Sequence, residues 1–419
     1  MNKRSYELLA PAGSLEKLKC AIHYGADAVY LAGKRFGLRA KAGNFSEAEL
    51  REAVAFAHGR GVRVFVTVNI MAHNDDLTEL PDYLLFLGTS GVDALIIADP
   101  GVFRLARRLL PQMSIHISTQ ANITNYESAC FWAEQGASRV NLARELSGAE
   151  IAQVCGQLPA KVEVFVHGAL CISYSGRCML SHYLTGRDAN LGACAHPCRY
   201  SYRLEEEKRP GEFLPVEEDE RGTYIFNAKD LCLLNRLPDL LAAGVHSLKI
   251  EGRMKGIYYA GGIVRIYRAA LDFLAEAWEK GAKLPRLGEA YMAEVEKLGS
   301  RGYTENFFDG PAQADSMLPS GPRVTQEYVP VALLAADSSG QEAEIDLRHV
   351  IRPGDELEYM GPGILNHPFT VLELRNEMGV ALEQANPGQQ VTLVADRPLA
   401  WQEHALIRRV RPGRPLPPS

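Results

Sequence analysis

The sequence predicts an α/β fold: a TIM-like (β/α)8 barrel with a cysteine-rich insertion, followed by a small C-terminal antiparallel β-barrel domain. Over the first 255 residues, a short β-branched run alternates with an amphipathic helical segment, and this unit occurs eight times. The runs are nearly continuous in apolar residues, which is typical of parallel strands covered on both faces. From residue 329 to 410, short strand-like runs alternate with turns, which indicates a second, antiparallel barrel.

The predicted strands of the first domain are evenly spaced along most of its length. They lie at residues 8–13, 28–33, 64–70, 94–100, 115–121, 139–144, 162–168 and 247–253. The segments between them are helical in pattern, and one of them begins with Ser46 and Glu49 at the spacing of a capping box. Eight such units favour a TIM-type barrel over an open doubly wound sheet. No G-x-G-x-x-G follows the first run, which weakens a dinucleotide-binding fold.

The domain boundaries follow from this spacing. We expect the barrel at 1–283, a connector at 284–328, the small β-barrel domain at 329–410 and a flexible tail at 411–419. The long gap between the seventh and eighth strands makes 169–245 an insertion. Because loops that follow barrel strands lie on the catalytic face of such barrels, the insertion is expected to build or cover the active site.

Composition sets the broad class. The chain has 419 residues, is 47% hydrophobic and 23% charged, and has a formal net charge of −6. These values are typical of a globular protein and exclude a globally basic nucleic-acid binder, although they leave room for a local basic face. No apolar run approaches the roughly 18 residues of a membrane helix. The first residues lack the apolar stretch of a signal peptide, so we expect a cytoplasmic protein without a membrane partner.

Cysteines give the most informative functional signal. Five of the eight fall within 62 residues: Cys171, Cys178, Cys194, Cys198 and Cys232. Without an export signal, such a group indicates a metal, a cluster or redox chemistry in preference to disulfides. The spacing is neither that of a zinc ribbon nor that of a bacterial ferredoxin, but four thiolates from separate loops can hold a [4Fe–4S] cluster.

Two alternatives to a cluster stay open for these five cysteines: buried structural thiols and a catalytic thiol. With five candidates for four positions, one cysteine is left over. The remaining cysteines lie on predicted helices among apolar residues and are expected in the core: Cys20, Cys130 and Cys155.

Polar residues stand at the ends of the predicted strands, where barrel enzymes place their chemistry. They are Asn69, Asp99, Gln120, Arg144, His167, Glu251 and Arg253. For each, a capping or rim role is the alternative. His167 lies four residues before Cys171, and an arginine at the end of the last strand is suited to a bidentate contact with a carboxylate. The chain contains no H-E-x-x-H and no G-x-S-x-G motif of the common hydrolases.

Three segments resemble one known family. EVFVHGALCISYSGRCMLS at 163–181 looks like the signature of the collagenase-like peptidases, peptidase family U32. ELLAPAGSLEKLKCAIHYGADAVYLAG at 7–33 and SLKIEGRMKGIYYAGGIVRIYR at 247–268 are similar to its pattern as well. The resemblance covers nearly the whole chain and implies a TIM-like barrel.

The resemblance also implies chemistry. Members of this family resemble oxygen-independent hydroxylases with a [4Fe–4S] cluster held by four cysteines. One branch hydroxylates wobble uridines of tRNA with prephenate as the hydroxyl donor. A second branch hydroxylates a cytidine of ribosomal RNA. A third branch works as a heterodimer and hydroxylates the ubiquinone ring. The length and C-terminal module here are most similar to the tRNA branch. By motif, Cys171, Cys178 and Cys232 match cluster positions, with Cys194 as the fourth ligand and Cys198 as its alternative.

The resulting expectation is a tRNA-modifying hydroxylase that acts on the anticodon loop and forms 5-hydroxyuridine. Substrate binding is expected of Arg144, Arg253, Gln120 and Asn69, with the arginines holding a small dicarboxylate such as prephenate. Catalysis is expected of His167 and Glu251, which would handle protons. The heterodimeric branch leaves open a homologous partner subunit. The rival interpretations are a collagenase-like protease that uses a thiol or a metal, and a non-catalytic iron–sulfur scaffold.

Overall fold

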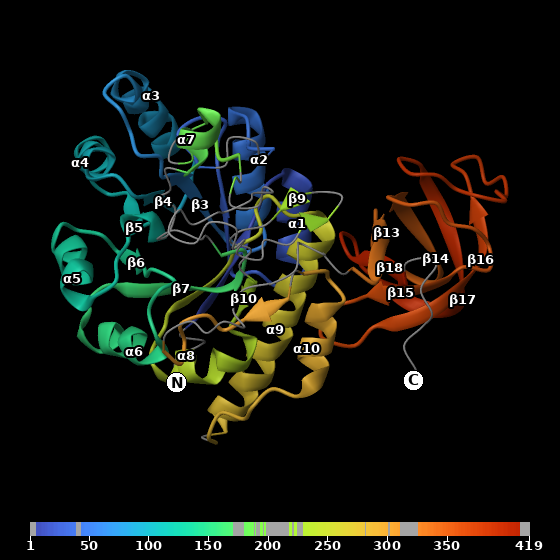
Figure 1. Cartoon of the computed structure of the whole chain (residues 1–419). Helices are drawn as coiled ribbons and strands as arrows, with labels where there is room; N and C mark the ends of the chain where they lie inside the picture. Colours follow the sequence, from blue (N-terminus) through green and yellow to red (C-terminus); the bar gives the residue numbers. More distant parts are fainter. Residues whose placement is uncertain are drawn as a thin grey trace, which may run out of the picture.

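The computed structural model describes residues 6–38, 43–170, 180–187, 189, 193–195, 197, 218–219, 222–223, 229–280, 282–300, 302–310 and 326–410. Within it, eight parallel strands close into a barrel, in the order β11-β1-β2-β3-β4-β5-β6-β7, with β7 paired to β11 (Figure 1). The strands are β1 (Glu7–Pro11), β2 (Ala28–Leu31), β3 (Arg63–Val68), β4 (Ala94–Ile97), β5 (Ser114–Ile117), β6 (Arg139–Asn141), β7 (Lys161–Gly168) and β11 (Ser247–Ile250). The predicted TIM-like barrel is therefore confirmed.

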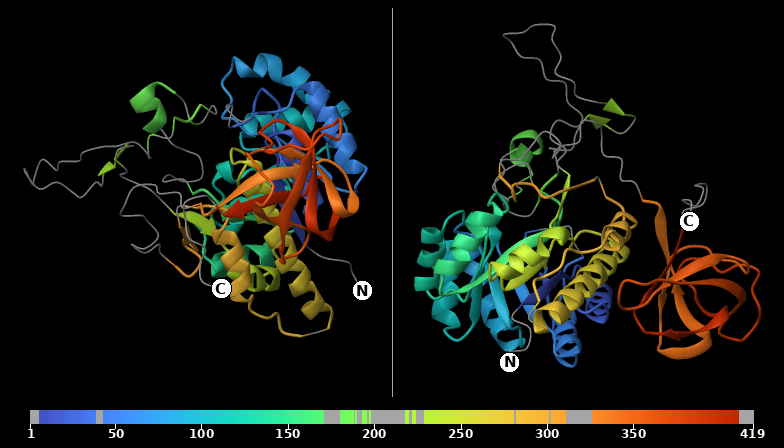
Figure 2. Two further views of the ribbon diagram at one scale, coloured as in Figure 1. Left: turned by 90° about the vertical axis from the view of Figure 1, so that its right-hand side faces the viewer. Right: turned by 90° about the horizontal axis from the view of Figure 1, so that it is seen from below.

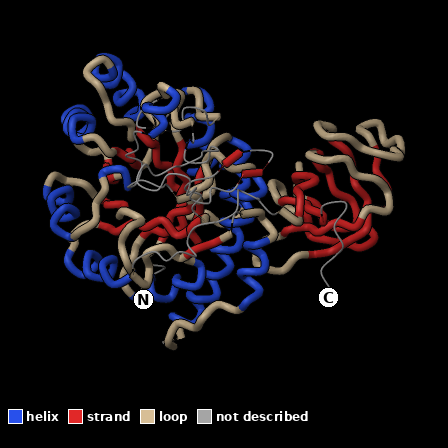
Figure 3. The backbone as a smooth tube through the Cα atoms, in the orientation of Figure 1, coloured by secondary structure: helices blue, strands red, loops and turns tan. Residues whose placement is uncertain are grey.

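Helices cover the outside of this barrel (Figure 3). They are α1 (Leu15–His23), α2 (Glu47–His58), α3 (Asp76–Thr89), α4 (Pro100–Leu109), α5 (Tyr126–Glu134), α6 (Gly148–Gln157), α8 (Leu237–Ala242) and α9 (Ile257–Glu279). The Ser46–Glu49 capping box is present at the start of α2. Cys20 on α1 is fully buried, as predicted, whereas Cys130 and Cys155 are half-buried at the edge of the core.

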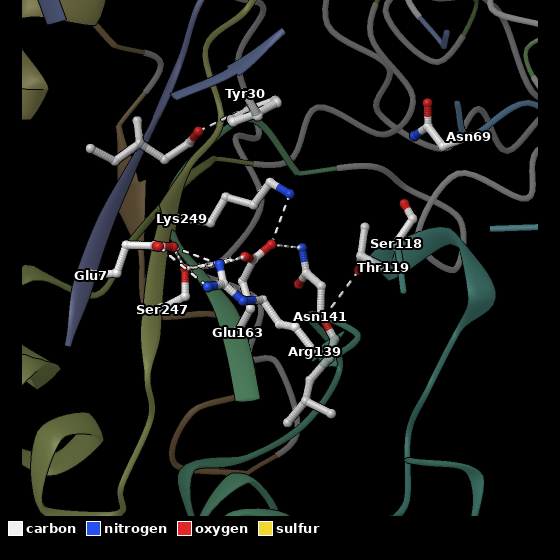
Figure 4. A network of polar contacts seen from close by, with 12 residues as sticks. Glu7, Tyr30, Asn69, Ser118, Thr119, Arg139, Asn141, Glu163, Ser247 and Lys249 are labelled. Atoms are coloured by element: carbon white, nitrogen blue, oxygen red, sulfur yellow. Dashed lines mark hydrogen bonds and ion pairs between the residues drawn. The ribbon is translucent and has the colours of Figure 1, made fainter. Parts of the chain in front are cut away.

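The barrel interior combines an apolar group with a charged one. The apolar residues are Leu9, Ala28, Tyr30, Phe65, Ala94 and Ile96. The charged group lies toward the N-terminal ends of the strands, since Glu7, Arg139 and Ser247 each begin one (Figure 4). Arg139 Nη1 donates to Glu7 Oε1 at 2.5 Å and to Glu163 Oε2 at 2.9 Å, while Lys249 Nζ donates to Glu163 Oε1 at 2.8 Å. These contacts join strands on different sides of the barrel.

Two short strands extend the sheet beyond the barrel at its C-terminal end. β10 (Asp230–Cys232) pairs antiparallel with the last residues of β7, and β12 (Tyr303–Thr304) pairs parallel with β10. β7 therefore contacts β11 along most of its length and β10 at its end. Further short elements of the insertion include α7 (Leu180–Thr185) and the β8–β9 pair (Glu218–Asp219 and Gly222–Thr223).

The C-terminal domain is a closed antiparallel barrel, as predicted, in the order β13-β14-β17-β16-β15-β18. Its strands are β13 (Tyr328–Leu334), β14 (Ser338–Leu347), β15 (Glu356–Met360), β16 (His367–Arg375), β17 (Gln390–Trp401) and β18 (Leu406–Val410). Trp401 is buried in its core with Tyr359 and Phe369 edge-on to its ring. The expected connector contains α10 (Glu289–Glu296) and β12, and the tail 411–419 lies outside the described residues.

The small barrel packs beside α1, α9 and α10 (Figure 2). The Tyr24 hydroxyl donates to the Met360 carbonyl at 2.7 Å and accepts from the Leu406 amide at 2.8 Å. Arg408 of β18 is completely buried and lies 2.9 Å from a carboxylate oxygen of Glu294 on α10. Buried polar contacts of this kind fix the relative position of two domains. Of the helices that the structure describes, none combines the length and apolarity needed to cross a bilayer.

Candidate functional site

Cys232 is the best-described of the five clustered cysteines. It lies on β10 directly opposite His167 of β7, and its side chain is buried. Its Sγ is 3.9 Å from the Tyr267 hydroxyl and 3.9 Å from Met292 Sδ. Burial raises the pKa of this thiol to about 11, so without a metal it stays protonated at neutral pH. A buried thiol beside a thioether is a soft donor environment, which fits an iron–sulfur cluster and not a hard cation.

Cys194 is half-buried, and its backbone is held from two sides. Arg187 donates to the carbonyls of Ala193 at 3.0 Å and Cys194 at 3.2 Å. The next amide, that of Ala195, donates to the Ser181 hydroxyl of α7 at 2.9 Å. The predictions for Cys171, Cys178 and Cys198 lie outside the described residues. Among the residues that are described, no group of three or more His, Cys, Asp and Glu side chains is placed to hold a metal.

His167 is completely buried, and its ring packs against Tyr259 and Tyr267 of α9 and Tyr303 of β12. Burial lowers the pKa of His167 to about 3, so its imidazole is neutral. The Tyr267 hydroxyl donates to the Val166 carbonyl at 2.8 Å, so its oxygen accepts the proton of His167 Nδ1, 3.3 Å away. With the proton on Nδ1, Nε2 is an acceptor.

Glu251, the second residue expected to handle protons, lies beside His167 through the backbone. The Glu251 amide donates to the His167 carbonyl at 2.8 Å. Gly168 adopts φ +117°, and a Cβ at this position would overlap the Glu251 backbone oxygen. Only glycine therefore permits this close approach of β7 to the loop after β11. The structure thus brings the backbones of the two predicted catalytic residues together.

Asn69, Gln120 and Arg253 form a second group at the strand ends. Asn69 Nδ2 donates to Gln120 Oε1 at 2.6 Å, and Asn69 Oδ1 accepts from the Leu38 amide at 3.2 Å. Arg253 is buried, donates to Thr67 Oγ1 at 3.0 Å and also contacts the Leu38 carbonyl. Asn69 and Arg253 therefore both contact the backbone of Leu38, a loop residue.

Arg144 lies apart from these residues, beside the entrance to the cysteine-rich segment. Its Nη1 donates to the Ala169 carbonyl at 2.5 Å, and its guanidinium lies 4.6 Å from the centre of the Phe165 ring. Asp99, also at a strand end, has the capping role that was the alternative to a site role. Its Oδ1 accepts from the Val102 amide at 2.9 Å and caps α4.

Several residues near His167 were not anticipated from the sequence. Asp230 is completely buried on β10, 3.6 Å from Lys255 Nζ, and Lys255 lies 4.9 Å from the centre of the Tyr259 ring. The one available signal was that Asp230 stands two residues before Cys232. Tyr259 and Tyr303 carried no such signal, since their positions depend on how α9 and β12 pack.

Sequence comparisons now identify the family. The family model described as Peptidase family U32 matches residues 13–318, and that of its C-terminal domain matches 325–408. The chain belongs to peptidase family U32. The resemblance of residues 7–33, 163–181 and 247–268 is therefore confirmed.

Within the U32 family, this chain is similar to proteins named for RNA modification. It is 39% identical to tRNA hydroxylation protein P1 of Bacillus subtilis (strain 168) over 388 residues, which is 92% of this chain and 90% of that protein. It is 36% identical to tRNA hydroxylation protein P of Escherichia coli (strain K12), over 92% of each chain. It is 34% identical to a 23S rRNA 5-hydroxycytidine synthase of the same organism, over 82% of this chain and 53% of that protein.

Proposed function

We propose that this U32 protein is an oxygen-independent tRNA hydroxylase that forms 5-hydroxyuridine at the wobble position. The observation that carries the proposal is the similarity across 92% of the chain to two proteins named for tRNA hydroxylation. The rRNA-modifying relative supports the more general activity, hydroxylation of a base in RNA. Prephenate is the proposed hydroxyl donor.

A [4Fe–4S] cluster held by Cys171, Cys178, Cys194 and Cys232 is part of this proposal, with Cys198 as the alternative to Cys194. The buried environment of Cys232 and the anchored backbone of Cys194 support it. When bound, the cluster supplies the electron transfer that hydroxylation without O2 requires.

The chain's own residues position the substrates. Arg253 and Arg144 place positive charge at the strand ends, where an anionic donor would be drawn in. The Asn69–Gln120 pair offers amide groups beside them. His167, with an accepting Nε2, and Glu251, whose backbone amide contacts the His167 carbonyl, are the residues proposed to handle protons.

Charge distribution indicates which part of the molecule meets the RNA. Residues 329–410 contain six arginines, no lysine and twelve acidic residues, so this domain accounts for the entire net charge of −6. The rest of the chain is balanced, with 39 basic and 39 acidic residues. Because phosphates repel a strongly acidic surface, we infer that the tRNA approaches the large barrel and not the C-terminal domain. Anticodon-loop bases are exposed single-stranded targets that suit a barrel mouth.

The test of the cluster is the iron and acid-labile sulfide content of protein purified without oxygen, with its visible spectrum. About four irons and four sulfides per chain, with a brown colour, support the proposal. A colourless protein without iron contradicts it, and a single tightly bound zinc would make the cysteines structural.

Peptidase activity is the second candidate, because the family model carries that description. It predicts peptide cleavage that persists in cluster-free protein and is lost when one cysteine is replaced. Cleavage of a denatured-collagen substrate by the apoprotein would favour it over the hydroxylase.

A further inference from the structure

The polar cluster between β7, β10 and α9 has the hydrogen-bonding pattern of a binding site. We propose that Tyr259 and His167 together bind a hydroxyl group of the small-molecule oxygen donor, next to Cys232. This inference rests on the proposed function and adds to it the residues that would recognise the donor.

The cluster is built from residues that are distant in sequence. His167 comes from β7, Asp230 from β10, Tyr259 from the first turn of α9 and Tyr303 from β12. The His167 ring centre is 5.9 Å from that of Tyr259 and 5.4 Å from that of Tyr303. His167 and Asp230 are completely buried, and Tyr259 is 5% exposed. The cluster is therefore shielded from bulk water.

The Tyr259 hydroxyl and His167 Nε2 have no hydrogen-bond partner among the described residues. An unsatisfied buried hydroxyl costs on the order of 1–3 kcal/mol. The ring centres of His167 and Tyr259 are 5.9 Å apart, a separation that one bridging group spans. By contrast, the hydroxyl of the neighbouring Tyr267 is satisfied by the Val166 carbonyl.

The two atoms are complementary to a hydroxyl group. Tyr259 has a proton to donate, whereas Nε2 of His167 is an acceptor because its partner Nδ1 carries the ring proton. A ligand hydroxyl can accept from the first and donate to the second at the same time. A carbonyl or a carboxylate would leave Nε2 unsatisfied.

The charges around this position are mixed. Lys255 is half-exposed and lies 4.9 Å from the Tyr259 ring centre, and its ammonium is 3.6 Å from the buried carboxylate of Asp230, which offsets its charge. A hydroxy acid would place its hydroxyl between Tyr259 and His167 and a carboxylate toward Lys255. Because Cys232 is directly opposite His167, the bound hydroxyl would lie beside the cysteine-rich region. A permanently bound water has the same hydrogen-bonding pattern and is the competing occupant.

The experiment is titration calorimetry with prephenate on the full-length protein, kept free of oxygen. Tyr259→Phe removes the unpartnered hydroxyl without breaking a hydrogen bond within the described protein. We expect it to weaken prephenate binding about tenfold, in line with one lost hydrogen bond to a charged or polar ligand, with an unchanged unfolding midpoint. The matched control is Tyr258→Phe on the same helix, whose hydroxyl contacts Lys297 and Arg408; it should lower the unfolding midpoint and leave binding within twofold.

Each other outcome overturns the inference. Wild-type affinity in Tyr259→Phe, with a lowered unfolding midpoint, would assign the position to a structural water. Absence of prephenate binding by the wild-type protein would overturn it as well. Nucleoside mass spectrometry of tRNA from cells that express the same proteins tests the proposed function separately. If the wild-type protein forms 5-hydroxyuridine but the calorimetry shows no effect of Tyr259→Phe, the hydroxylase function stands and the donor site at Tyr259 and His167 is wrong.

Discussion

Gly168 controls the geometry of the candidate site at the scale of a single residue. We expect Gly168→Ala to destabilise the protein by about 1–3 kcal/mol, because its φ of +117° disfavours a side chain and the new Cβ would meet the Glu251 backbone. The measurement is denaturant unfolding. Gly156→Ala is the control, since Gly156 lies in α6 with open space around it, and alanine there should be neutral or slightly stabilising. Equal stability of the two variants would refute the close-approach argument.

Replacement of Cys232 tests whether this residue is a cluster ligand or a structural thiol. We expect Cys232→Ala to lower the iron content of anaerobically purified protein from about four per chain to well below one-half of that, because an incomplete ligand set loses the cluster. Cys155→Ala, a half-buried cysteine on α6, should retain full iron. The measurement is the iron content of both variants. An iron content equal to that of the wild type in Cys232→Ala would show that Cys232 is not a cluster ligand.

The sequence anticipated the residues whose signal is local. Cysteine spacing indicated Cys232, and strand ends indicated Asn69 and Gln120, whose amides do meet. It did not anticipate Tyr259 or Asp230. Their placement depends on β10 turning back along the end of β7, and a three-residue strand has too few residues to show a periodic pattern.

At the scale of elements, the charged group inside the barrel joins β1, β6, β7 and β11. Burial by itself raises the pKa of Glu163, but the charges of Lys249 and Arg139 outweigh it and hold the pKa at about 2, below the ordinary value of 4.5. This carboxylate therefore contributes stability that is fully present above about pH 4.5 and is lost as the pH falls toward 2.

Glu163→Gln should lower the free energy of unfolding by about 3–5 kcal/mol at neutral pH, because Lys249 and Arg139 lose their shared counter-charge in a buried position. It should also reduce the loss of stability on acidification. Urea unfolding at pH 7 and pH 3 measures both effects, because the lower pH lies inside the window between 4.5 and 2. Glu344→Gln, at an exposed position of β14, is the control and should change neither. A parallel pH dependence of Glu163→Gln and wild type would contradict the assignment.

The strands themselves were predictable and the charged group was not. All eight barrel strands lie where the apolar runs predicted, and all except β7 end earlier because the small and polar residues at the run ends belong to loops. Glu7 immediately precedes one such run and Arg139 begins another, at positions where charged residues usually mark the solvent-exposed strand end. Only closure of the barrel brings them together inside.

At the scale of the whole molecule, Arg408 joins the two domains. Its guanidinium is buried and contacts Glu294 of α10 at 2.9 Å and Glu358 of β15 at 2.8 Å. We expect Arg408→Met to lower the free energy of unfolding by about 1–3 kcal/mol, because the partly exposed Glu358 loses this ion pair and Glu294 keeps only Lys297 and Arg265 as partners. Denaturant unfolding tests this. Arg397→Met, an exposed arginine paired with Asp396, should be without measurable effect, and equal results for the two variants would contradict the role of Arg408.

The central claim is that the cysteine-rich barrel hydroxylates tRNA without oxygen. The most direct measurement is nucleoside mass spectrometry of tRNA from cells that lack their own tRNA hydroxylation genes, grown without oxygen and expressing the wild type, Cys232→Ala or Cys155→Ala. The wild type and Cys155→Ala are predicted to restore 5-hydroxyuridine at the wobble position, and Cys232→Ala is predicted not to. Unmodified uridine in cells that contain the iron-loaded wild-type protein, or full modification by Cys232→Ala, would contradict the claim.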